Sequence, residues 1–175
     1  ESYAQIRECL PAVAEKIRRN GGSQVLGWQI WKTDILVEAE FHAVWKSPKG
    51  ELKDITPKQP PETRILFLAD SKVKYNGAQI DNYRINISGN RIVDDFIEIE
   101  KAIFRIENKG ERALQYKLKL SEQEVASLNA LQKMKTEIEF MAKNRMNRNS
   151  PCFCESHNKY KHCHGEKLAE RLKSL

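Results

Sequence analysis

Near its C-terminus the chain reads PCFC at residues 151–154 and, after eight further residues, CHG at 163–165. This stretch holds three of the four cysteines of the 175-residue chain. Three thiolates and one imidazole are a typical closed ligand set for structural zinc, which they bind tetrahedrally at roughly 2.0–2.3 Å. The spacing therefore predicts a Zn²⁺ site formed by Cys152, Cys154, Cys163 and one histidine.

These cysteines have alternative uses as a disulfide framework or as unrelated free thiols. Cys152 and Cys154 are too close together for an easy disulfide, and cytosolic thiols are normally kept reduced. Two further histidines, His157 and His162, lie between the cysteine pairs and could compete for the ion. Metal binding explains the clustered cysteines better than disulfides or free thiols do. The spacing does not decide which histidine is the fourth ligand.

The segment 149–165 resembles the SEC-C motif, a zinc-binding tail known from the SecA protein-translocation ATPase. The resemblance is carried by the Cys-x-Cys pair, by KYK at 159–161 and by the Cys-His pair at 163–164. It departs from that pattern at 155–157, where the family has small turn residues. The resemblance implies that His164 is the fourth zinc ligand and that the tail docks on a partner.

The tail also carries most of the positive charge. Residues 143–175 contain eight Lys or Arg and three Asp or Glu, a balance of +5 within a total of +6. Concentrated positive charge favours an acidic partner, such as a chaperone or other protein, the ribosome or another nucleic acid, or an anionic lipid surface. We expect Lys159 and Lys161, which stand between the ligand pairs, to make this contact. The alternative is a tail that only keeps the chain soluble.

The polar, basic run 144–150 predicts a linker between a body domain, 1–143, and the zinc tail, 151–175. Chelation is then expected to unfold the tail and spare the body. No apolar run approaches the ~20 residues needed to cross a bilayer, and no apolar signal segment is present. We therefore expect a soluble, cytoplasmic protein.

Hydrophobic periodicity predicts an α+β body. The alternation over 35–47 is that of a half-buried strand, and further strands are expected at 23–33, 51–55, 64–69 and 83–87. Helices are predicted at 10–19, 92–107 and 121–143, the last opened by a capping box. The predicted fold is a small, mainly antiparallel sheet of four to six strands flanked by helices, with the zinc tail attached.

Three residues of the body occur in the order that thiol enzymes use: Cys9 near a helix start, His42 on the polar face of a strand and Asp54 at the next strand. A helix N-terminus lowers a thiol's pKa, an imidazole takes its proton and a carboxylate fixes the imidazole tautomer. The residues at 27–28 and 40–45 also loosely resemble the His-bearing strand of papain-like and transglutaminase-like enzymes. That resemblance implies a hydrolase or acyl-transferase acting on an amide or ester.

Each of these residues also has a structural interpretation. Cys9 can be a core thiol, His42 a surface residue of its strand and Asp54 a turn-capping acid, while Glu40 competes with Asp54 for orienting the imidazole. Two functions remain open: a zinc-dependent adaptor whose body is a scaffold, and a thiol enzyme that the tail recruits to its substrate. A hydrogen bond between Cys9 and His42 would favour the enzyme.

Overall fold

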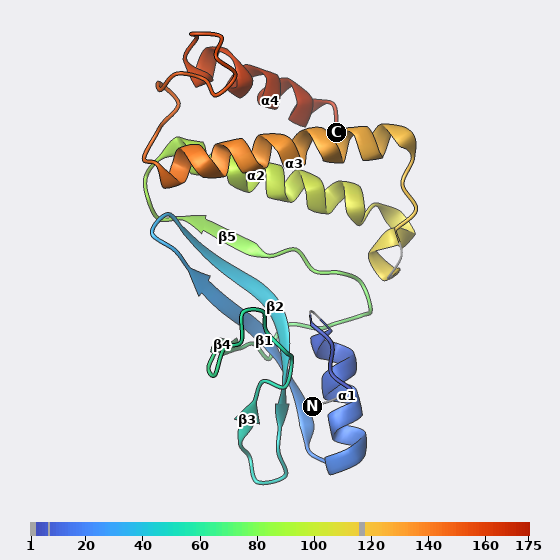
Figure 1. Cartoon of the computed structure of the whole chain (residues 1–175). Coiled ribbons are helices and arrows are strands. Elements are labelled where there is room, and N and C mark those ends of the chain that lie inside the picture. Colours follow the sequence, from blue (N-terminus) through green and yellow to red (C-terminus); the bar gives the residue numbers. More distant parts are fainter. Residues whose placement is uncertain (1–2, 7, 116–117) are drawn as a thin grey trace. The chain divides into compact units, whose positions relative to one another are not determined.

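The computed structural model describes residues 3–6, 8–115 and 118–175 (Figure 1). It has the predicted α+β fold, with a small antiparallel sheet and several helices. The helices are α1 Cys9–Asn20, α2 Arg91–Glu107, α3 Glu122–Lys143 and α4 His164–Lys173, with 3₁₀ turns η1 Gly110–Leu114 and η2 Tyr160–His162. The strands are β1 Ser23–Lys32, β2 Leu36–Lys46, β3 Leu52–Lys53, β4 Leu66–Ala69 and β5 Tyr83–Asn86.

The chain divides into two compact units. The first unit contains Glu1–Trp31 and Glu38–Asn76, and the second contains Lys32–Val37 and Gly77–Leu175. The second unit therefore includes the tip of the β1–β2 hairpin. In the described part of the chain, no helix is both long enough and apolar enough to span a membrane.

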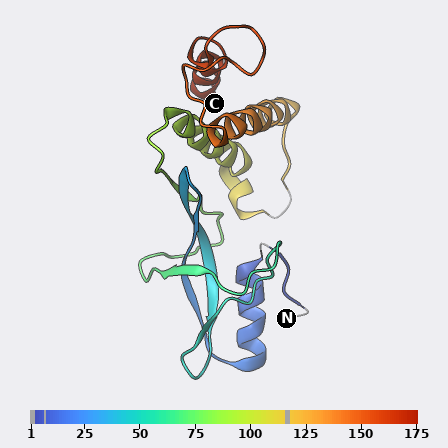
Figure 2. The same cartoon turned by 60° about the vertical axis from the view of Figure 1, so that its left-hand side comes forward.

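The first unit is built from α1 and the sheet strands. The strand order is β3-β2-β1-β4, and β2 pairs with β3 and β1 with β4 in antiparallel fashion. Helix α1 lies alongside these strands in both views (Figures 1 and 2) and packs Val13 against Ala43 and Trp45 of β2. The Trp45 indole N–H donates to the Gly21 carbonyl at 2.9 Å, which ties the end of α1 to β2.

Strands β1 and β4 approach each other closely at Gly27, which pairs with Ala69. A Cβ on Gly27 would lie 2.2 Å from the Leu68 carbonyl oxygen and 2.9 Å from the Ala69 Cα. A glycine inside a strand often marks such a close backbone approach. Residue 27 therefore has no room for a side chain while β4 is paired.

The C-terminal half of β2 is buried on both faces, from His42 to Trp45. The predicted half-buried strand is thus wrong for this half, although the alternation is present in the sequence. His42 was expected on a polar face but is only 4% exposed. It is covered because Cys9, Asp54 and the Phe67 ring contact its imidazole.

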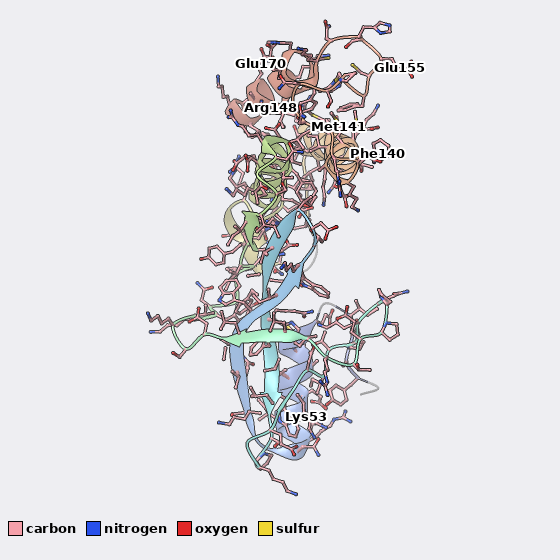
Figure 3. All side chains as sticks on the ribbon, turned by 90° about the vertical axis from the view of Figure 1, so that its left-hand side faces the viewer. Lys53, Phe140, Met141, Arg148, Glu155 and Glu170 are labelled. Atoms are coloured by element: carbon pink, nitrogen blue, oxygen red, sulfur yellow. The ribbon has the colours of Figure 1, made fainter. Side chains whose placement is uncertain are left out.

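The second unit has α2 and α3 at its core, lying side by side in both views (Figures 1 and 2). The predicted capping box of α3 is present, with Ser121 and Glu124 bonding each other's backbone N–H. On α3, Met141 is fully buried whereas the adjacent Phe140 is 60% exposed (Figure 3). The helix therefore presents one apolar face to the core, as an amphipathic helix does.

The zinc-tail segment packs into the core of this unit. Cys152, Tyr160 and Leu168 belong to the same buried cluster as the apolar residues of α2 and α3. The helix α4 of this segment was not predicted. It buries Leu168, which is 1% exposed, and so adds an apolar contact to the second unit.

The run 144–150 also contacts α2. The Asn90 amide, at the N-cap of α2, donates to the Met146 carbonyl at 2.7 Å. Arg148 Nε lies 3.3 Å from Asp95 Oδ2. The predicted division into a body, a linker and an independent tail stays a prediction about folding.

Candidate functional site

The first unit brings Cys9, His42 and Asp54 together. Cys9 is the first residue of α1, His42 lies in β2 and Asp54 follows β3. The Cys9 side chain lies beside His42, close enough to raise its pKa, and His42 Nε2 lies 3.0 Å from Asp54 Oδ1. The imidazole therefore links the thiol to the carboxylate.

Helix α1 gives Cys9 a favourable place for an anion. The described residues supply no side-chain cap at the start of α1 and no acidic side chain in its first turn. The N-cap residue is nevertheless the acidic Glu8, whose side chain makes no capping hydrogen bond. Reactive cysteines commonly occupy such positions at helix N-termini.

The charges of His42 and Asp54 depend on each other. Burial disfavours the imidazolium, but hydrogen bonds to Asp54 and Cys9 and the charges of both outweigh burial and raise the pKa of His42 to about 9. Burial would likewise raise the pKa of Asp54, whereas hydrogen bonds from His42, the Thr56 backbone and Lys58 lower it to about 2. At neutral pH the pair is therefore an imidazolium and a carboxylate.

The Asp54 carboxylate is held by residues that the sequence analysis missed. The Thr56 backbone N–H donates to Oδ1 at 3.0 Å, and Lys58 Nζ lies 3.0 Å from Oδ2. Lys58 also donates to Oε1 of the buried Gln29 at 2.8 Å. The sequence feature that indicates the Thr56 contact is the position of Asp54 two residues before Thr56, a spacing typical of an Asx-turn.

Glu40 does not take the orienting role. Its Oε2 accepts a hydrogen bond from the Trp31 indole N–H at 2.8 Å. The carboxylate bonded to His42 is that of Asp54. The alternative of a surface His42 is also wrong, because its side chain is buried.

A cavity of about 330 Å³ opens beside the thiol, within the range of small-ligand sites. Cys9 and His42 lie in its wall, together with Thr56 and Lys58. The Phe67 ring packs edge-on against the His42 ring, with centroids 6.4 Å apart. A small molecule in the cavity can therefore reach the half-buried Cys9 thiol and the buried His42 imidazole.

The second unit holds the predicted metal cluster. One ligand atom from each of four residues lies within 4.8 Å of the others, the residues being Cys152, Cys154, Cys163 and His164. Cys152 Sγ is 3.1 Å from His164 Nδ1, and Cys154 Sγ is 3.5 Å from Cys163 Sγ. Two thiolates bound tetrahedrally at about 2.3 Å lie about 3.8 Å apart, so the donor set fits one ion.

Backbone hydrogen bonds place the cysteines around one loop. The Cys152 N–H donates to the Asn158 carbonyl at 2.8 Å, which closes the turn between them. Glu155 and His157 in this turn adopt positive φ values of 58° and 59°. Small residues suit such positions, which gives a physical reason for the small turn residues of the SEC-C pattern.

The other two histidines lie outside the cluster. His157 is exposed, and His162 is exposed with its Nδ1 3.6 Å from Glu166 Oε1. A hydrogen bond with Ser156 lowers the pKa of the Cys154 thiol to about 6. Because a metal binds thiolates, this shift favours metal binding at neutral pH.

A comparison with protein families matches the SEC-C motif to residues 148–166. No curated protein and no solved structure matches the chain. The papain-like and transglutaminase-like resemblance of the first unit therefore has no support from a relative or a solved structure. The matched segment contains the whole Cys/His cluster. The C-terminal segment of this chain thus carries a SEC-C motif whose Cys and His side chains can hold a metal ion.

Proposed function

We propose that the first unit is a thiol hydrolase or acyl-transferase and that the zinc-binding tail brings it to its substrate. The observation that carries the proposal is that Cys9 and His42 line one cavity and that His42 Nε2 lies 3.0 Å from Asp54 Oδ1. A nucleophile within reach of a base that is itself oriented by a third group is the arrangement of covalent catalysis. All three groups come from different elements of one unit.

In the proposed reaction, His42 holds the Cys9 proton and the thiolate attacks the carbonyl carbon of an amide or ester. The leaving amine or alcohol departs with the proton from His42, and a thioester remains on Cys9. Water or a second amine then attacks the thioester while His42 accepts its proton. The S–C bond breaks, the acid or amide product leaves, and the Cys9 thiolate is restored. Asp54 keeps the ring oriented and stabilises its charged form.

The electrostatics give a reason to prefer this role to a structural one. A buried imidazolium–carboxylate pair costs desolvation and is weak evidence for a stabilising contact. Perturbed pKa values beside a cavity occur more often at functional sites. His42 and Asp54 have such pKa values, and His42 lies in the cavity wall.

Iodoacetamide alkylation of the zinc-loaded protein tests the proposal. An ordinary thiol is only a few per cent thiolate at neutral pH, so we expect His42→Ala to slow Cys9 alkylation roughly 30-fold. The difference should shrink towards pH 9, where His42 loses its proton. Mass spectrometry locates the label, and Cys9→Ala gives the background from the tail cysteines.

Asp54→Asn serves as a second variant that keeps the shape of the site. It should slow alkylation less than His42→Ala, because the ring keeps its place but loses its carboxylate partner. Lys53→Gln, an exposed change on the neighbouring β3 (Figure 3), should have no effect. Equal rates in the parent and in His42→Ala would make Cys9 a core thiol and leave only the adaptor function.

The second part of the proposal is that the metal is zinc and that the tail docks on an acidic macromolecule. A cavity within the second unit supports docking, because five Lys or Arg side chains and three acidic ones lie in its wall. The basic ones are Arg91, Lys143, Arg145, Arg148 and Lys161. Both sites need reduced thiols, which suits the cytoplasm.

A Lys159→Glu, Lys161→Glu variant is expected to bind anionic partners at least tenfold more weakly at low salt, since each contact with a phosphate or carboxylate adds electrostatic attraction. Sedimentation with purified ribosomes and elution from heparin measure the effect. The zinc content should stay the same, because neither lysine is in the metal cluster. Lys72→Glu, Lys74→Glu makes the same charge change on exposed residues of the first unit. Equal weakening by both variants would show that the net charge of the chain, and not the charges of Lys159 and Lys161 in particular, governs binding.

A further inference from the structure

The cavity beside Cys9 carries a carboxylate that the proposed acylation does not use. Glu40 lies in the cavity wall together with Cys9 and His42. Glu40 and His42 are two residues apart in β2, so their side chains leave the same face of the strand about 7 Å apart. A group bound by Glu40 would therefore stand one short chain away from the carbonyl that Cys9 attacks.

Trp31 of the neighbouring strand β1 holds this carboxylate in place. Its indole N–H donates to Glu40 Oε2 at 2.8 Å. The other oxygen, Glu40 Oε1, has no hydrogen-bond partner among the described residues, yet it is not closed off from solvent. The half-buried Glu40 thus keeps one oxygen that can accept a hydrogen bond from a donor in the cavity.

The positive charges in the cavity wall already have partners. Lys58 Nζ lies 3.0 Å from Asp54 Oδ2, and His42 Nε2 lies 3.0 Å from the other oxygen of the same carboxylate. In the proposed enzyme the Cys9 thiolate balances the second of these charges. Neither cation is therefore left over to neutralise Glu40.

Negative charge is in excess in the same wall. Glu40 and the exposed Glu62 both lie there, and neither has a counter-ion among the described residues. Trp31 lies in the wall as well, and the face of an indole ring attracts cations. A carboxylate beside an indole suits an ammonium or guanidinium group, which donates charge-assisted hydrogen bonds. An anionic substrate would instead meet uncompensated negative charge.

We propose that the Cys9 cavity selects amides and esters whose acyl group carries an ammonium or guanidinium, and that Glu40 binds this positive charge, which rests on the proposed thiol-enzyme function. The spacing of about 7 Å along β2 matches an acyl chain of lysine-like length between the carbonyl and the charge. Glu40 touches the substrate away from the reacting atoms. It therefore sets specificity and takes no part in proton transfer.

Three p-nitrophenyl esters of nearly the same length test this selection. The 6-aminohexanoate ends in an ammonium, the heptanoate in a methyl group and the hydrogen adipate in a carboxylate. In each reaction the Cys9 thiolate attacks the ester carbonyl, an S–C bond forms and p-nitrophenolate leaves. Rates are measured on the zinc-loaded full chain, with Cys9→Ala as background. Each rate is divided by that of the same ester with 2-mercaptoethanol, which removes the intrinsic reactivity of the esters.

We expect the ammonium ester to acylate Cys9 roughly tenfold faster than the methyl ester, and the carboxylate ester to be the slowest, because charge-assisted hydrogen bonds are the strong ones. Glu40→Gln keeps an acceptor for the Trp31 N–H and should reduce the preference for the ammonium to about twofold or less. Glu51→Gln removes the same charge from an exposed residue outside the cavity wall and should leave the preference intact.

Charge selection and the thiol enzyme fail in different ways. Equal rates for the three esters, or no acylation at all, on a parent whose Cys9 is alkylated in a His42-dependent way overturn the charge selection. A preference that Glu51→Gln lowers as much as Glu40→Gln overturns it too. Alkylation independent of His42 refutes the thiol enzyme itself. The order of the three esters is measured on the parent, so it decides the matter even if Glu40→Gln does not fold, as judged by circular dichroism.

Discussion

A Cys152→Ser, Cys163→Ser variant is expected to lose its zinc and much of the stability of the second unit. Metal binding supplies on the order of 10 kcal/mol in small zinc peptides, and the remaining Cys154 thiolate and His164 imidazole cannot hold the ion alone. Cys152 and Tyr160 pack in the same core as α2 and α3, so loss of the ion also disturbs that core. Zinc analysis after dialysis should fall from one ion per chain to a trace, and thermal unfolding should begin earlier.

The matched control is Cys9→Ser, which removes a thiol outside the cluster and should retain zinc. Hydrogen exchange with and without a chelator tests the shared core more directly. Faster exchange in both α3 and the tail agrees with one cooperative unit. Exchange that accelerates in 151–175 alone would instead agree with the independent tail that the sequence predicts. Stoichiometric zinc in the double variant would contradict the ligand assignment.

Gly27→Ala is expected to destabilise the first unit by about 3 kcal/mol, the upper end for overpacked sites. The new Cβ would meet backbone atoms of Leu68 and Ala69 at 2.2 and 2.9 Å, and backbone cannot rotate away as a side chain can. Strand β4 must then move, and Phe67 with it, so the cover of His42 loosens. Urea unfolding followed by tryptophan fluorescence measures the loss, and Cys9 alkylation should slow in parallel.

Gly50→Ala separates the clash from the backbone preference of glycine. Gly50 has φ of 90° and no atom within 4 Å of a new Cβ. Its replacement should cost about 1–2 kcal/mol through the left-handed conformation alone and leave alkylation unchanged. A Gly27→Ala protein as stable as the parent would mean that β4 does not pair with β1 at this position.

Local patterns predicted most of the elements. The capping box at Ser121 located the start of α3, and the helix predicted at 10–19 begins one residue earlier, at Cys9. Helix α4 was missed because its buried residues are few, and the residues before it were interpreted only as metal ligands. The burial of His42 was missed because its cover comes from Cys9 and Phe67, which are remote in sequence.

The two candidate sites were predictable to different degrees. The three cysteine ligands lie within a short segment, so spacing alone brought them together, whereas the choice of His164 came from the resemblance to the SEC-C motif. Cys9, His42 and Asp54 were identified from their order along the chain, but their contact depends on how α1 and the strands pack. Lys58 was not predicted, because its contact with Gln29 joins a loop to a strand far away in sequence.

The turn of the metal segment has a consequence for how tightly the ion is held. Glu155 and His157 occupy left-handed backbone conformations, which cost a residue with a side chain about 1 kcal/mol each. When the ion leaves, the turn is free to relax and recover this energy. Since about 1.4 kcal/mol changes an equilibrium constant tenfold, the two residues together weaken retention of the ion by roughly 30-fold relative to a glycine-containing turn. A bound metal ion should therefore exchange more readily from this turn than from one with glycine at these two positions.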